Sequence, residues 1–211
     1  MHEHLTLEAC VESLEEAILA EKKGAERIEL CSRLDLDGLT PDRKLIKQVI
    51  NHLRIPVKVM IRPRPGDFIY TADELSIMKD EIQFCKQAGA QGVVFGILDK
   101  THNLNLDQIQ LLAELASPLE VTIHKVIDLT PDPTTSLTEL MPLRNITAVL
   151  TSGGAATAME GKETIKKMLQ ASKGKINIVA AGKITNKNLA EIHQLIRAHE
   201  YHGRRIVGQL I

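Results

Sequence analysis

Two Glu-x-Cys units combine a carboxylate and a thiol at the same spacing. They are Glu8-Ala-Cys10 and Glu29-Leu-Cys31. Aliphatic and polar residues alternate around both units, which predicts strands, and residues two apart share one face of a strand. Neighbouring strands lie about 4.8 Å apart, so the sulfurs of Cys10 and Cys31 would be close enough to share one soft ion. Thiolates select Cu(I) among physiological metals, which makes these two cysteines candidate metal ligands. The alternative is that they are ordinary small core residues.

A second group of candidates lies in the stretch 57–70, V-K-V-M-I-R-P-R-P-G-D-F-I-Y. Its first six residues alternate as in a strand, and two prolines and a glycine then end that strand. The loop that follows carries Arg62, Arg64 and Asp67. Loops at the carboxyl ends of parallel strands hold ligands in α/β folds, and guanidinium groups suit carboxylates or phosphates. Arg62 and Arg64 are therefore candidate anion-binding residues, and the alternative is a structural ion pair with a carboxylate of the barrel.

Further candidates have acid–base or backbone chemistry. His124 and Asp128 follow a predicted strand and would suit a general base and the group that orients it. The turn Ser152-Gly153-Gly154 exposes backbone N–H groups near a helix start, where barrels often bind phosphate. Gly182 lies in the same place after the next strand. A structural role is the alternative for each of them, because barrel histidines are often simply hydrogen bonded and glycines simply form turns.

The elements that would position these residues alternate along the chain. Helix starts are indicated by capping boxes at residues 13–16 and 71–74, by Thr40 as an N-cap before Pro41, and by Asp132 before Pro133. A helix is also expected directly after the turn at 152–154, reaching about residue 172, and another from Thr185. The predicted strands are residues 5–11, 27–31, 57–62, 91–98, 119–124, 146–151, 175–181 and 200–203.

This alternation predicts a single-domain (β/α)₈ barrel spanning residues 1–211 rather than an open sheet. After residue 203 only R-R-I-V-G-Q-L-I remains, so the eighth helix is expected to be short or missing. The apolar residues of this tail would then need a partner, which predicts a homo-oligomer. They are Ile206, Val207, Leu210 and Ile211.

Strand parity separates the two faces of the barrel. The aliphatic side of each strand should face the helices, and the other side should face the axis. Buried carboxylates need partners, so Glu8 and Glu29 are expected to pair with Arg27, Arg62 or Arg64, or to hold an ion, and both are acid–base candidates. The mouth of the barrel is expected to contain Arg62, His124 and Ser152. The residues predicted to point inward are Glu8, Cys10, Glu29, Cys31, Met60, Arg62, Thr122 and His124.

Composition excludes several classes of function. The net charge is -1 and aromatic residues make up 2% of the chain, with no Trp. Neither a basic field nor a stacking surface for nucleic acid is therefore expected. No apolar run approaches the roughly 20 residues that cross a bilayer. The absence of a secretory signal at the amino end and an odd number of cysteines, three, predict a cytoplasmic protein with reduced thiols.

Several segments together resemble the copper-homeostasis (CutC) family, and the resemblance runs over nearly the whole chain. The string M60-I-R-P-R-x-G-D-F68 is its most specific part. The chain departs from the family pattern at A180-A-G-K183, where a glycine-rich run is usual, and at H202-G-R-R205. The other matching segments are E8-A-C-V11, R27-I-E-L-C-S32, G38-L-T-P41, G92-V-V-F-G96, V121-T-I-H124 with D128, and L150-T-S-G-G154.

The resemblance implies a cytoplasmic, usually oligomeric (β/α)₈ barrel linked to copper handling through Cu(I)-binding cysteines, a role that falls on Cys10 and Cys31. Two functions follow as hypotheses. The first is a Cu(I)-binding homeostasis protein. The second is a barrel enzyme of lyase or isomerase type for a small anionic or phosphorylated substrate. In the second, Arg62 and Arg64 would bind the anion, and Glu8, Glu29 or His124 would transfer protons.

Overall fold

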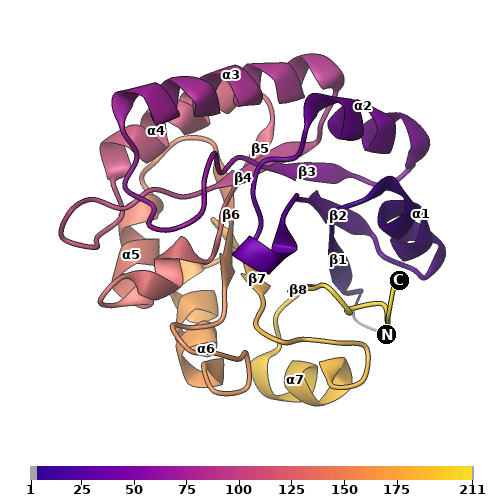
Figure 1. The fold of residues 1–211 in the computed structure, drawn as a ribbon. Coiled ribbons are helices and arrows are strands. Elements are labelled where there is room, and N and C mark those ends of the chain that lie inside the picture. Colours follow the sequence, from indigo (N-terminus) through magenta and orange to yellow (C-terminus); the bar gives the residue numbers. More distant parts are fainter. Residues whose placement is uncertain (1–3, 211) are drawn as a thin grey trace.

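The computed structural model describes residues 4–210 and confirms the predicted (β/α)₈ barrel. Eight parallel strands close in the order β1 to β8, with helices around them (Figure 1). The strands are β1 Thr6–Val11, β2 Arg27–Leu30, β3 Val57–Met60, β4 Gly92–Phe95, β5 Glu120–Ile123, β6 Ile146–Thr151, β7 Asn177–Ala180 and β8 Glu200–Gly203. The helices are α1 Leu14–Lys22, η1 Leu34–Leu36, α2 Arg43–His52, α3 Ala72–Ala88, α4 Leu106–Ala116, η2 Lys125–Leu129, α5 Pro133–Leu140, α6 Lys162–Ser172 and α7 Leu189–Ile196.

The main apolar core lies between the barrel and the ring of helices. Ile28 of β2 and Val59 of β3 point outward into it, as parity predicted, and Met78 and Ile82 of α3 pack there from the helix side. A strand covered by helices on its outer face and by barrel side chains on its inner face is buried on both sides. The polar residues of each strand are consequently concentrated along the barrel axis.

The helix-start signals were only partly correct. Thr71 and Glu74 form the predicted reciprocal capping box of α3, and Gly89 ends that helix in the left-handed conformation. Thr40, however, is not the N-cap of α2. Its hydroxyl accepts a hydrogen bond from the backbone N–H of Arg62 at 2.7 Å, and Asp42 caps the helix instead. The helix after β6 was also predicted too early, because α6 begins only at Lys162.

The barrel closes where β8 pairs with β1 in parallel register, with Glu8 opposite His202. No helix follows β8 within residues 204–210, and this segment lies between α7 and α1, where an eighth helix would complete the ring (Figure 1). Ile206 and Leu210 are buried in the chain's own core, so the argument for an oligomer from an uncovered apolar tail was wrong for them. Ile211 lies outside the described residues, and the oligomer itself stays a prediction.

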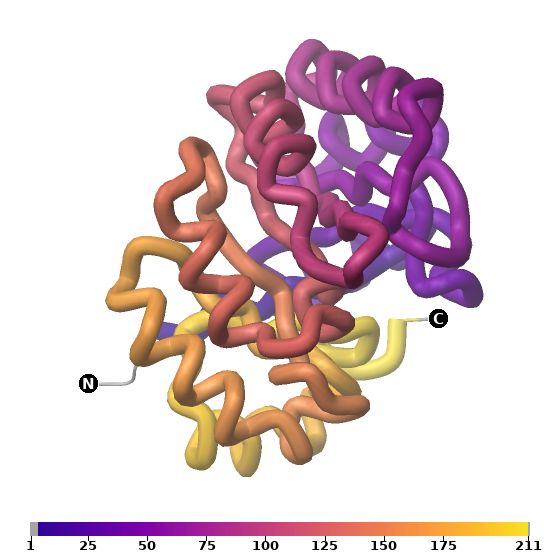
Figure 2. Tube along the Cα trace, turned by 90° about the vertical axis from the view of Figure 1, so that its left-hand side faces the viewer, coloured from indigo at the N-terminus to yellow at the C-terminus, as the bar shows by residue number. Residues whose placement is uncertain are grey.

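The side view shows the same ring of helices, with the carboxyl-terminal half of the chain gathered in the lower part of the molecule (Figure 2). Among the described residues, no helix has the length and apolar character that crossing a membrane requires.

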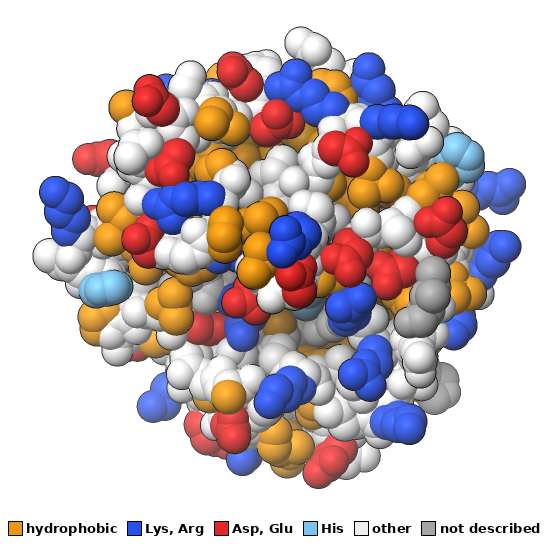
Figure 3. All heavy atoms as spheres, in the orientation of Figure 1, with side chains coloured by type: hydrophobic (Ala, Val, Ile, Leu, Met, Phe, Trp, Pro, Cys, Tyr) orange, Lys and Arg blue, Asp and Glu red, His pale blue; other side chains and the backbone are white. Residues whose placement is uncertain are grey.

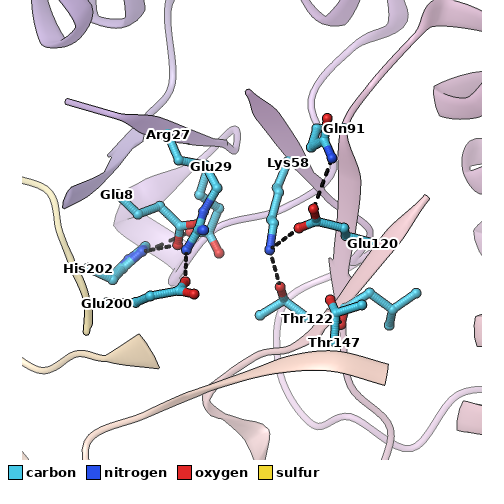
Figure 4. Close-up of polar contacts among 11 residues, drawn as sticks. Glu8, Arg27, Glu29, Lys58, Gln91, Glu120, Thr122, Thr147, Glu200 and His202 are labelled. Atoms are coloured by element: carbon cyan, nitrogen blue, oxygen red, sulfur yellow. Dashed lines mark hydrogen bonds and ion pairs between the residues drawn. The ribbon is translucent and has the colours of Figure 1, made fainter. Parts of the chain in front are cut away.

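A polar cluster near the amino ends of the strands is built around Lys58 of β3, which is 1% exposed. Its ammonium lies 3.0 Å from Thr122 Oγ1 and 3.1 Å from Glu120 Oε2 (Figure 4). Gln91 donates to the other oxygen of Glu120 at 2.9 Å. Because Glu120 is half-exposed, solvent shares in stabilising its charge, and the lysine stem contributes mainly by filling the barrel.

Lys58→Met is therefore expected to cost about 1 kcal/mol or less in the free energy of unfolding, because it keeps the stem and replaces an ion pair by an apolar group. Lys58→Ala is expected to cost about 2–4 kcal/mol, because it leaves a cavity in the barrel. Urea denaturation of both variants measures the difference. Equal losses would show that the charge, and not the stem, stabilises this layer.

Candidate functional site

The two thiols lie together in the barrel, at the ends of neighbouring strands. Cys10 of β1 lies opposite Glu29, and Cys31 directly follows β2. Their Sγ atoms are 3.8 Å apart, both residues are buried, and neither forms a disulfide. Both line a cavity of about 940 Å³ at the barrel mouth. The geometry that strand parity predicted for this pair is present.

His202 of β8 is the residue of this cluster that sequence reasoning missed. Its Nδ1 lies 2.8 Å from Glu8 Oε1 and its Nε2 lies 3.7 Å from Glu29 Oε2 (Figure 4). These carboxylates and an interaction with Cys10 raise the pKa of His202 against the effect of burial. A signal was available in the sequence, because residue 202 has the inward parity of a strand that was recognised. Residues 200–203 were predicted as a strand, but the side chains of this strand were not assigned to its inner or outer face.

The two inward carboxylates differ in their partners. Glu8 forms an ion pair with Arg27, which also pairs with Glu200 (Figure 4). Burial opposes its charge, yet Arg27 and His202 outweigh burial and hold the pKa of Glu8 well below its usual range. Glu29 contacts none of the arginines proposed for it. Its Oε2 accepts from the Cys31 thiol at 3.6 Å, its Oε1 has no partner, and burial raises its pKa.

The pKa values of the two thiols are shifted in opposite directions. A hydrogen bond from Cys31 lowers the pKa of Cys10 to about 5 against the effect of burial, and His202 lowers it further. The same hydrogen bond and burial raise the pKa of Cys31. The single proton of the Cys31 thiol can be donated to Cys10 Sγ at 3.8 Å or to Glu29 Oε2 at 3.6 Å, and the lowered pKa of Cys10 favours the first arrangement.

Arg62 lines the cavity, but its guanidinium mainly supports the loops around it. It donates to the carbonyl oxygens of Leu36 at 2.9 Å, Gly38 at 3.1 Å and Gly66 at 3.2 Å, and it lies over the ring of Phe68. The Nε of Arg62 has no partner among the described residues. The side chain thus holds the mouth loops in place and still has one unpaired donor.

Arg64 is engaged elsewhere. Its guanidinium pairs with Glu74 and with Asp67, and it does not line the cavity. The structural ion pair that was the alternative for these arginines is therefore present for Arg64, although with loop and helix carboxylates rather than one from the barrel. Anion binding by Arg64 stays a prediction, and it would require breaking these pairs.

His124 lines the cavity as a neutral ring. Its Nδ1 accepts a hydrogen bond from the backbone N–H of Val126 at 3.1 Å, so the proton lies on Nε2, which has no partner. Burial and the charge of Arg62 lower its pKa to about 3. Gly96 makes this position possible, because a Cβ there would lie 2.8 Å from His124 Cε1. His124 could therefore donate a hydrogen bond into the cavity.

Asp128 does not orient His124, because its carboxylate organises the turn after β6. It accepts from the backbone N–H of Ser152 at 2.8 Å and of Gly154 at 2.9 Å. The N–H of Gly153 donates to Thr151 Oγ1. Ser152 is fully buried and does not line the cavity, so its expected place at the mouth was wrong. Phosphate binding by residues 152–154 stays a prediction that would require displacing Asp128.

Besides the buried Arg62, four basic residues line the cavity. Of these, Lys183 and Arg205 have no ion-pair partner among the described residues, whereas Arg204 pairs with Glu12 and Glu16. On the face shown in Figure 3, acidic and basic side chains are interspersed rather than separated into fields. The basic residues of the mouth are Lys125, Lys183, Arg204 and Arg205.

The lowered pKa of Cys10 gives a direct prediction. In the metal-free, reduced protein, the ultraviolet absorbance of a thiolate should persist as the pH falls and disappear with a midpoint of about 5. His202→Gln removes a group that favours the thiolate, so the midpoint should move upward. Cys85→Ser should leave it unchanged, because that thiol is in the outer core with its pKa raised to about 12. A wild-type midpoint near the ordinary value for cysteine would contradict the geometry described here.

Comparison with known proteins identifies the family of the chain. The sequence profile of the CutC family matches residues 5–207. A protein of Homo sapiens named copper homeostasis protein cutC homolog is 41% identical over 196 residues, which cover 93% of this chain and 71% of the human protein. A CutC family protein of Histophilus somni is 39% identical over 198 residues, covering 94% and 81% of the two chains.

Solved structures give the same result. That of a CutC protein from Streptococcus agalactiae matches with a TM-score of 0.91 and 30% identity over 96% of this chain and 99% of the other. An aldolase named QR15 matches with a TM-score of 0.69 at 12% identity, which shows a shared fold alone. With a family profile over nearly all its length and relatives close to 40% identical, the chain belongs to the CutC family.

Proposed function

We propose that this protein binds Cu(I) through Cys10 and Cys31 and takes part in copper homeostasis. The observation that carries the proposal is the 3.8 Å separation of two thiol sulfurs on the wall of an open cavity. Two soft donors this close together suit the soft monovalent ion Cu(I), which prefers sulfur ligands. The human and mouse relatives are named copper homeostasis protein cutC homologs, which supports the same role.

The proposal includes a cytoplasmic location, where thiols stay reduced. Cys10, Cys31 and Cys85 are all free and buried. A disulfide between Cys10 and Cys31 would remove both proposed copper donors, so the function needs a reducing compartment.

If the two sulfurs share one Cu(I), Cys10→Ser and Cys31→Ser should each abolish tight binding rather than halve it, because one thiolate alone supplies only half of the coordination. Competition against a Cu(I) chelator under reducing conditions measures the affinities. The matched control is Cys85→Ser, which removes a buried thiol outside the cavity and should bind as the wild type does. Unchanged affinity in the Cys10 and Cys31 variants would make both thiols core residues.

A second candidate function is suggested by the other wall of the cavity. His124 Nε2 and Arg62 Nε are buried donors without hydrogen-bond partners in the described part of the chain, and the cavity is far larger than one ion requires. Unpaired buried donors are rare, and they favour a ligand that accepts hydrogen bonds. A small organic or phosphorylated anion therefore remains the alternative, with the protein acting on it as an enzyme.

The rim cations allow a test of this alternative that leaves the buried residues intact. At low ionic strength, inorganic phosphate or malonate should raise the melting temperature of the wild type by binding to the folded state. The double variant Lys183→Gln, Arg205→Gln should lose most of this shift. The double variant Lys44→Gln, Lys167→Gln, with both residues exposed on the outer helices α2 and α6, serves as the charge-matched control. Equal shifts in all three proteins would show only non-specific screening.

A further inference from the structure

Four donor atoms from three adjacent strands surround one position in the barrel. They are Cys10 Sγ of β1, Cys31 Sγ and Glu29 Oε2 from the β2 region, and His202 Nε2 of β8. The sulfurs are 3.8 Å apart, Glu29 Oε2 lies 3.6 Å from Cys31 Sγ and 3.7 Å from His202 Nε2, and His202 contacts Cys10. The ligand atoms of Cys10, Glu29 and Cys31 all lie within 4.8 Å of one another.

These separations match the edges of a tetrahedron around Zn²⁺. Zinc bonds of about 2.3 Å to sulfur and about 2.0–2.1 Å to nitrogen or oxygen place two sulfurs about 3.8 Å apart and the mixed pairs about 3.4–3.5 Å apart. The three measured separations, 3.8, 3.6 and 3.7 Å, are within a few tenths of an ångström of these edges, and a bound ion would draw His202 toward the group formed by Cys10, Glu29 and Cys31. We propose that Cys10, Cys31, Glu29 and His202 form a tetrahedral site for a borderline divalent cation of the Zn²⁺ class.

The carboxylate behind His202 supports this assignment. Nδ1 donates to Glu8 Oε1 at 2.8 Å, which turns Nε2 toward Glu29 (Figure 4), and a bound cation would take the place of the Nε2 proton. A carboxylate behind an imidazole is the usual arrangement around a metal-bound histidine, because it fixes the tautomer and the ring orientation. Arg27 holds Glu8 in turn, so the ring is fixed before any ion arrives.

Glu29 supplies an independent observation. It is 2% exposed, its ion-pair partner among the described residues is His202, and its Oε1 has no hydrogen-bond partner among them. A bound cation would satisfy this oxygen and favour the charged form of a carboxylate whose pKa burial raises. The cavity reaches all four donors, so an ion has a path to the site.

This inference rests on the thiol pair of the proposed function and adds to it. Cu(I) needs only soft sulfur donors, whereas Zn²⁺ also uses the imidazole and the carboxylate. The site therefore discriminates between the two metals through Glu29 and His202, and a divalent ion would compete with copper for the same sulfurs.

The test uses the full chain, reduced and stripped of metal by a chelator. Co²⁺ is added as a spectroscopic substitute, followed by Zn²⁺ in competition with a chromophoric chelator. The wild type should show the intense visible bands of tetrahedral Co²⁺ together with sulfur-to-cobalt charge transfer, and Zn²⁺ should displace both. Absence of these bands in the wild type overturns the inference without need of any variant.

Substitutions of single residues test which of the proposed donors bind the ion. Glu29→Gln and His202→Gln should lose the tetrahedral spectrum and lower the affinity for Zn²⁺ far more than the affinity for Cu(I). Glu8→Gln, one shell further out, should weaken Zn²⁺ binding by about 10–100-fold. The exposed His52→Gln is the matched control and should bind as the wild type does. Wild-type Zn²⁺ affinity in both Glu29→Gln and His202→Gln would contradict the four-donor site.

The same measurements distinguish this inference from the proposed function. Tight Cu(I) binding without a tetrahedral Co²⁺ spectrum would sustain the copper role and reject the divalent site. A tetrahedral Co²⁺ spectrum without tight Cu(I) binding would reject the copper role and leave the divalent site standing.

Discussion

The interior of this barrel depends on how the buried carboxylate of Glu8 is satisfied. An unpaired charge in this position would cost several kcal/mol, about the size of a domain's whole stability. Arg27 and His202 both contact it, one from the next strand and one from the last, and Arg27 is in turn held by Glu200. Because these partners come from both neighbours of β1, the charge network fixes the position of β1 within the closed sheet and fixes the imidazole beside the thiols.

The cavity above this network has two unlike walls. Thiols, Glu29 and His202 form one wall, and Arg62 and His124 with their unpaired N–H groups form the other. Copper chemistry needs only the first wall, which leaves the second without a role in that function. Because chemistry depends on the site and not on the barrel, the fold shared with aldolases does not assign a reaction to this protein.

Strand alternation and parity were sufficient to predict the barrel and the proximity of Cys10 and Cys31, because both follow from short-range periodicity. The same parity places His202 inward on a strand that was predicted, but the strand has four residues and no aliphatic alternation, so its inner face was not assigned. Alternation and parity could not show that Asp128 occupies the turn after β6, since that contact joins residues 24–26 positions apart through loop conformation. Thr40 failed as a cap for the same reason: its hydroxyl is used by the end of β3, a long-range contact that local sequence does not reveal.

The pairing of β8 with β1 has a consequence for the order in which the molecule matures. Cys10, Glu29 and Cys31 belong to the part of the chain that a ribosome makes first, whereas His202 arrives with the strand that closes the sheet. Until that strand docks, Glu8 lacks its imidazole, and the thiols lie at an open sheet edge. A partly synthesised chain can offer sulfur to a passing ion, but the enclosed arrangement exists only once the barrel is shut. Loading of the proposed metal site would thus be tied to completion of folding.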